Sequence, residues 1–96
     1  MKIAVIGAGY VGLVSAACFA EFGFDVACID KEPKRIDALN AGKMPIYEPG
    51  LDHVVHANVQ AGRLTFSSDL NAAVARADVV FIAVGTPTRR GDGHAD

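Results

Sequence analysis

Hydrophobic positions along the chain fall into short continuous runs that alternate with longer segments of helical spacing. The runs at residues 2–6, 25–29 and 78–84 have the length of strands buried in a sheet, and residues 63–67, RLTFS, are a further strand candidate. The segments with helical spacing occupy residues 10–22, 33–41, 51–61 and 68–75. This β-α-β-α-α-β-α-β order predicts an α/β fold in which crossover helices join parallel strands.

Local signals refine the helix boundaries. Gly23 follows the first expected helix, Pro33 stands where the second begins, and Ser68 is placed to cap the last. The segment 44–50, MPIYEPG, contains two prolines and predicts a tight connection to which no chemical role is assigned. Five residues of the first helix lie close to one face and are expected to be buried: Val11, Val14, Cys18, Phe19 and Phe22.

Three glycines stand where the first strand passes into the first helix. Gly7, Gly9 and Gly12 form the pattern G-x-G-x-x-G directly after the apolar run KIAVI. In such a turn the first glycine permits the bend, the second lets a pyrophosphate approach the backbone, and the third lets helix and strand pack closely. The free N–H groups near Tyr10 and Val11, together with the helix dipole, predict an anion site. A simple turn without a ligand is the alternative interpretation.

An acidic residue follows at the distance that a dinucleotide site requires. Asp30 ends the second apolar run, about 20 residues beyond the glycines, where a carboxylate accepts hydrogen bonds from the adenosine ribose. Its charge disfavours a 2′-phosphate, so NAD is expected rather than NADP, although Lys31, Lys34 and Arg35 could accept a phosphate. An acid at a helix N-terminus is the alternative for Asp30. The βαβ context predicts a Rossmann-type parallel sheet of order 3-2-1-4, an incomplete half of a doubly wound domain.

Composition and charge narrow the class of protein. The chain has 96 residues, of which 51% are hydrophobic, and its formal net charge is −2. The lack of a basic block argues against nucleic acid, and no apolar run approaches the roughly 18 residues of a membrane span. The two cysteines form no disulfide framework, so we expect a soluble cytoplasmic protein.

The remaining residues with reactive or ligating side chains are expected to be structural. Cys18 and Cys28 fall within apolar segments, where a buried thiol is inert, so neither is expected to be catalytic. His53 and His56 lie three residues apart on an expected helix, but no third ligand has suitable spacing. The sequence therefore predicts neither a metal site nor a catalytic residue.

The chain also resembles the N-terminal part of the nucleotide-sugar dehydrogenases, the family of the UDP-glucose, GDP-mannose and UDP-N-acetylmannosamine enzymes. The resemblance rests on KIAVIGAGYVGLVSAACFAEFGFDVACID, MPIYEPGLD and DVVFIAVGTPT, and Tyr47 in the second segment favours the UDP-glucose branch. It implies that Val11 offers backbone to the pyrophosphate and that Asp30 and Arg35 hold the adenosine end of NAD. It also implies that Thr86 lies against the cofactor.

The resemblance further implies an activity. Such enzymes oxidise a sugar primary alcohol to a carboxylate, as in UDP-glucose to UDP-glucuronate, with two NAD and a catalytic cysteine. In the family this cysteine and the sugar-binding domain lie downstream of Asp96. Residues 1–88 are therefore expected to form part of an NAD-binding domain and 89–96 a flexible polar tail, so the chain alone is expected to be inactive. An edge strand at 78–84 predicts self-association of the chain when it is isolated, and a homo-oligomer is also expected.

Three alternatives to a UDP-glucose enzyme stay open from the sequence. The first is a GDP-mannose or UDP-N-acetylmannosamine dehydrogenase of the same family. A flavin-binding oxidoreductase is the second, because it uses a similar glycine turn. A nucleotide-sensing module, which would bind the dinucleotide without catalysing a reaction, is the third.

Overall fold

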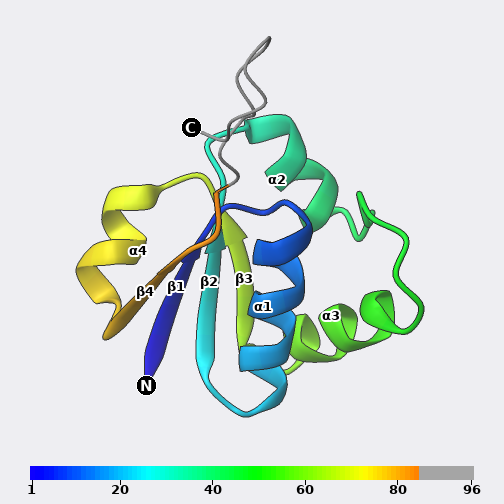
Figure 1. The fold of residues 1–96 in the computed structure, drawn as a ribbon, viewed down its shortest axis with the longest axis horizontal. Coiled ribbons are helices and arrows are strands. Elements are labelled where there is room, and N and C mark those ends of the chain that lie inside the picture. The colour runs from blue at the N-terminus through cyan, green and yellow to red at the C-terminus, as the bar shows by residue number, and fades with distance from the viewer. Residues whose placement is uncertain (85–96) are drawn as a thin grey trace, which may run out of the picture.

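A parallel sheet of four strands forms the centre of the molecule, as seen in a computed structural model that describes residues 1–84 (Figure 1). The strands are β1 (Lys2–Ile6), β2 (Asp25–Ile29), β3 (Leu64–Ser67) and β4 (Val79–Ile82). They lie in the order β3-β2-β1-β4, and the register pairs Ile3 of β1 with both Val26 and Val79. The α/β class and the strand order predicted from the sequence are therefore confirmed.

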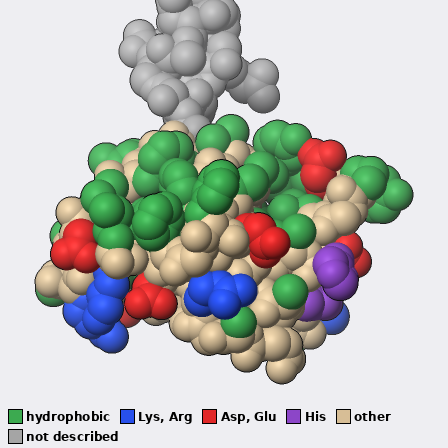
Figure 2. All heavy atoms as spheres, turned by 90° about the horizontal axis from the view of Figure 1, so that it is seen from below, with side chains coloured by type: hydrophobic (Ala, Val, Ile, Leu, Met, Phe, Trp, Pro, Cys, Tyr) green, Lys and Arg blue, Asp and Glu red, His purple; other side chains and the backbone are tan. Residues whose placement is uncertain are grey.

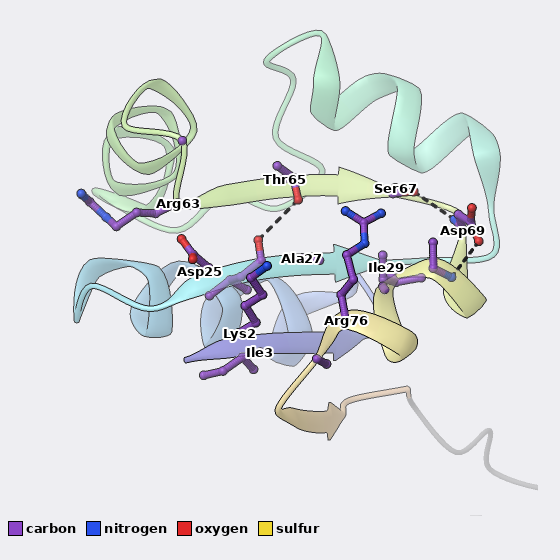
Figure 3. Close-up of a pocket in the computed structure, with 15 residues that line it drawn as sticks. Lys2, Ile3, Asp25, Ala27, Ile29, Arg63, Thr65, Ser67, Asp69 and Arg76 are labelled. Atoms are coloured by element: carbon purple, nitrogen blue, oxygen red, sulfur yellow. Dashed lines mark hydrogen bonds between the residues drawn. The ribbon is translucent and has the colours of Figure 1, made fainter.

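Four helices cover the two faces of this sheet unequally. They are α1 (Tyr10–Glu21), α2 (Pro33–Asn40), α3 (Leu51–Gln60) and α4 (Leu70–Arg76). Helices α1 and α3 contact each other on one face, whereas α4 contacts β1 and β2 from the other (Figures 1 and 3). Every helix begins and ends within two residues of its expected bounds, because glycine, proline and polar caps punctuate the chain.

The helix ends match the expected signals with one exception. Gly23 follows α1 with φ +106°, and Pro33 occupies the first turn of α2. The prediction that Ser68 caps α4 is wrong. Asp69 is the capping residue, and its Oδ1 accepts a hydrogen bond from Ala72 N at 3.1 Å. The cap therefore lies one residue later than the sequence indicated, at Asp69 rather than Ser68.

The core lies between the sheet and the face formed by α1 and α3. Its fully buried side chains include Val5 of β1, Cys28 of β2 and Leu64 of β3, which occupy one face of the pleat. The α1 residues that reach this core are small apart from one leucine: Gly12, Leu13, Ala16, Ala17 and Ala20. Burial of these small side chains places the helix axis close to the sheet.

The prediction of which face of α1 is buried is wrong. Val11 and Cys18 are exposed, and Phe22 keeps 80% of its surface accessible. Val14 and Phe19 are partly buried, and Phe19 packs edge-on against Phe81 at 5.5 Å between ring centroids. The helix is apolar on nearly every side, so close approach of the small residues, rather than hydrophobic spacing, decides which face is buried.

Strand β4 forms one edge of the described sheet. Although its composition is typical of a strand covered on both faces, Val79 is 45%, Val80 is 41% and Ile82 is 71% exposed. Figure 2 shows hydrophobic side chains gathered over the upper part of the face drawn there. The expected self-association depends on this edge and stays a prediction.

The contact between α1 and the end of β1 tolerates no side chain at Gly12. A Cβ atom placed there would lie 1.7 Å from the carbonyl oxygen of Gly7. We therefore expect Gly12→Ala to lower the free energy of unfolding by about 3 kcal/mol, measured by urea denaturation followed by circular dichroism. Gly9→Ala is the matched control, because, its two chain neighbours apart, no atom of residues 1–84 lies within 4 Å of its Cβ position. It should cost less than about 1 kcal/mol, and equal losses in the two variants would contradict the packing role of Gly12.

Candidate functional site

The turn after β1 is shaped by a glycine in a conformation that other residues rarely adopt. Gly7 has φ +110°, and its N–H donates to the carbonyl of Ile29 at 2.6 Å. A Cβ at this position would come within 3.0 Å of the backbone of Ala83 and Val84. The bend after β1 is thus fixed against the carboxyl ends of both neighbouring strands.

Helix α1 begins directly beyond this turn, and among residues 1–84 no side chain caps its first N–H groups. Gly9 is its N-cap, makes no side-chain cap, and no acidic residue follows in the first turn. The space around Gly9 is open, and its φ of −77° is one that any residue adopts, so the glycine provides room rather than a special conformation. Tyr10 and Val11 form the exposed first turn. This arrangement suits an anion such as a pyrophosphate.

Asp30 links the end of β2 to the glycine turn. Its Oδ2 accepts a hydrogen bond from Ala8 N at 2.9 Å, and its Oδ1 accepts one from Glu32 N at 2.9 Å. Arg35, in α2, places Nη1 at 3.2 Å from Oδ2. The carboxylate therefore holds the turn, the chain after β2 and the start of α2 in one arrangement.

These contacts lower the pKa of the Asp30 carboxyl. Burial alone would raise the pKa of its carboxyl, but the hydrogen bonds from Ala8 and Glu32 and the charge of Arg35 outweigh it and lower the pKa. Asp30 is consequently ionised at neutral pH. Its charge and remaining lone pairs are available to hydroxyl donors such as those of a ribose.

One cleft of about 570 Å³ brings these parts together at the carboxyl ends of the strands. Four residues predicted from the sequence line it, namely Gly7, Gly9, Asp30 and Arg35. Tyr10 and Val11 follow directly in the chain, and Gly12 packs beneath the turn against Gly7. The remaining predicted residue, Thr86, lies outside the described residues, as does the predicted tail 89–96.

Sequence reasoning missed several residues of this cleft. They come from the ends of β3 and β4 and the start of α4, and they are Ser68, Leu70, Ala83 and Val84. The signal that could have found them is the strand order, because successive strands are added on one side of β1 up to β3 and β4 is then added on its other side. Ligands of such sheets bind outside the carboxyl ends of the strands at this point.

A second groove, of about 420 Å³, lies on the α4 face of the sheet (Figure 3). Lys2 and Arg76 extend into it, and the carboxylates of Asp25 and Asp69 also line it. It contains neither a cysteine nor a histidine among its lining residues. It also lacks the helix N-terminus of the other cleft, so it has less to offer a dinucleotide.

The cysteines lie in different surroundings. Burial, with a smaller effect from the charge of Asp30, raises the pKa of the Cys28 thiol to about 12, so this thiol stays protonated at neutral pH. Cys18 is exposed, and the expectation that it belongs to the core is wrong. It sits on the side of α1 that faces away from the small-residue contact with the sheet.

Residues 1–84 contain neither a metal cluster nor a helix of membrane-spanning length. No group of three or more His, Cys, Asp or Glu residues there could hold a metal ion. No helix in the same part of the chain is long and apolar enough to cross a membrane.

The parallel sheet, the glycine turn and the acidic residue at the end of β2 define a Rossmann-type dinucleotide-binding domain. Residues 1–96 match the family model described as UDP-glucose/GDP-mannose dehydrogenase family, NAD binding domain. The chain belongs to this family, and its cofactor is NAD.

Similar proteins carry dehydrogenase names. The chain is 68% identical over 96 residues to a UDP-glucose 6-dehydrogenase of Rhizobium meliloti, covering 100% of the chain and 22% of that protein. A GDP-mannose dehydrogenase of Pseudomonas aeruginosa, solved as a ternary complex, superimposes with a TM-score of 0.93 at 43% identity, covering 100% of the chain and 22% of that structure. A UDP-glucose dehydrogenase from Pyrobaculum islandicum superimposes with a TM-score of 0.91 at 44% identity, covering 99% of the chain and 22% of that structure. The chain thus spans about a fifth of the length of these relatives.

The contacts of Asp30 predict a dependence of stability on pH. Because the folded pKa is lowered below the unfolded value of about 3.9, the stabilisation is present above that pH and is lost as pH falls through the folded pKa. We expect Asp30→Asn to lower the free energy of unfolding by about 1 to 2 kcal/mol at pH 7, with the difference shrinking below about pH 4. Urea denaturation across pH measures this difference.

Asp37→Asn provides the control, because Asp37 is exposed on α2 and its side chain makes no hydrogen bond to another described residue. It should leave stability unchanged at both pH values. A loss in Asp30→Asn that does not vary with pH would contradict the ionised state of Asp30.

Proposed function

We propose that these residues form part of the NAD-binding domain of an enzyme that oxidises UDP-glucose to UDP-glucuronate with two NAD. The choice of UDP-glucose is supported by the 68% identity to a relative of that name, against 43% over 90 residues for a GDP-mannose 6-dehydrogenase. The exposed Tyr47 in PIYEPGL is consistent with this choice. Oxidation of GDP-mannose is the second candidate within the family.

The observation that carries the proposal is the ionised Asp30 beside the uncapped first turn of α1. The N–H groups at Tyr10 and Val11 would bind the pyrophosphate, and the open space at Gly9 would let it approach the backbone. Asp30 would accept hydrogen bonds from the adenosine ribose. NAD, when bound, supplies the hydride acceptor for the oxidation.

Arg35 and Asp30 together support a preference for NAD over NADP. The guanidinium of Arg35 is already paired with the carboxylate, at 3.2 Å, and so is less available to a 2′-phosphate. A 2′-phosphate would also meet the negative charge of Asp30. Thr86, which follows β4 in the sequence, is proposed to lie against the cofactor.

The chemistry itself is assigned to residues beyond this chain. Cys28 is buried and protonated, and Cys18 is not among the residues that line the cleft. Neither is proposed as the nucleophile that captures the sugar aldehyde. The described residues would bind and orient the cofactor while the sugar and the catalytic cysteine come from the remainder of the enzyme.

The test is an assay of the full-length protein with each candidate sugar nucleotide. We expect about two NADH per UDP-glucose consumed, and little NADH from GDP-mannose or UDP-N-acetylmannosamine. Gly9→Val is the control, because its side chain would fill the pyrophosphate position; it should fold but lose NAD binding and activity. Oxidation of GDP-mannose in preference to UDP-glucose would contradict the proposed substrate, and full activity of Gly9→Val would contradict the proposed site.

A further inference from the structure

The segment 44–50, between α2 and α3, has few contacts to hold it in place. None of its backbone N–H groups donates to a backbone carbonyl of another described residue, and Pro45 and Pro49 have no N–H to donate. Its apolar anchors are Met44 and Ile46, which are partly buried against the core. A segment with so few backbone hydrogen bonds belongs to the least stable parts of a fold.

Only one side-chain hydrogen bond connects this segment to the rest of residues 1–84. Glu48 Oε1 accepts it from the hydroxyl of Tyr10 at 2.5 Å, across 38 positions of sequence. The neighbouring Tyr47 makes no hydrogen bond to a described residue and is 91% exposed. Tyr10 and Tyr47 are both exposed, but only Tyr10 donates its hydroxyl to a carboxylate of the described residues.

Tyr10 occupies a sensitive position in the candidate site. It is the first residue of α1, directly after the N-cap Gly9, and so belongs to the turn whose N–H groups face the proposed pyrophosphate. Its hydrogen bond to Glu48, reinforced by the negative charge of that residue, raises the pKa of the phenol. The hydroxyl therefore remains a donor throughout the neutral range.

We propose that Glu48 is a positioning residue for the dinucleotide, acting through the hydroxyl of Tyr10 on the first turn of α1. Two carboxylates then hold the glycine turn, since Asp30 accepts from Ala8 on the side of β2 and Glu48 accepts from Tyr10 on the side of segment 44–50. This inference rests on the proposed NAD site. Because coupling is reciprocal, NAD bound at the turn also stabilises segment 44–50 against opening.

A double-mutant cycle in the full-length protein tests the coupling. The variants are Tyr10→Phe, Glu48→Ala and the two combined, with NAD affinity measured by isothermal titration calorimetry. Each single variant is expected to weaken NAD binding by about three- to tenfold. The double variant should bind NAD no more weakly than the single variant with the lower affinity, because all three lose the same hydrogen bond. Glu48→Gln, whose amide oxygen still accepts, should retain most of the affinity.

Hydrogen exchange supplies a readout that a purely structural contact would not change. NAD should slow exchange of the Leu51 amide, which donates to the carbonyl of Glu48, in the parent and in Glu48→Gln, but not in Glu48→Ala. Tyr47→Phe is the matched control, since it removes a hydroxyl from the same segment without touching Tyr10, and it should behave as the parent.

The outcomes separate this inference from the proposed function. A parent protein that fails to bind NAD would refute the proposed site itself. A parent that binds NAD while Glu48→Ala and Tyr10→Phe leave its affinity unchanged, or weaken it additively, would overturn only the role of Glu48.

Discussion

The close contact between Gly12 and the carbonyl of Gly7 is the constraint on which the site depends. A Cβ at Gly12 would lie 1.7 Å from that oxygen, so only glycine lets α1 begin this near the end of β1. The contact brings the N-terminus of α1 to the carboxyl ends of the strands, where the cleft lies. It also selects the buried face of α1, because a helix that approaches so closely must present alanines to the sheet. The larger side chains on the opposite side are left exposed.

Asp30 connects the stability of the fold with the chemistry of the site. It accepts from Ala8 and Glu32 and pairs with Arg35, so it connects the glycine turn, the chain after β2 and the start of α2. The same contacts keep it ionised and partly buried at the wall of the cleft. A carboxylate fixed in this way needs little reorganisation to accept a ribose hydroxyl, which favours binding.

Most of the fold and the centre of the site could be predicted because their signals are local. Apolar runs marked β1, β2 and β4, and the spacing from the glycines to Asp30 indicated where the site lies. The parts that could not be predicted depend on tertiary contacts. Hydrophobic spacing did not identify the buried face of α1, since nearly every side of that helix is apolar, and Cys18 was misplaced for the same reason. The bond from Tyr10 to Glu48 joins residues whose proximity no local pattern reveals.

The central claim is that the dinucleotide binds at the glycine turn rather than in the groove beneath α4. The most direct measurement is to label the glycines of the protein with ¹⁵N, add NAD stepwise, and record the amide signals by nuclear magnetic resonance. Gly7, Gly9 and Gly12 report on the turn, and Gly62 lines the other groove. The account predicts saturable shifts of the amides at the turn while Gly62 stays unchanged. Shifts at Gly62 with none at Gly7, Gly9 and Gly12 would contradict it.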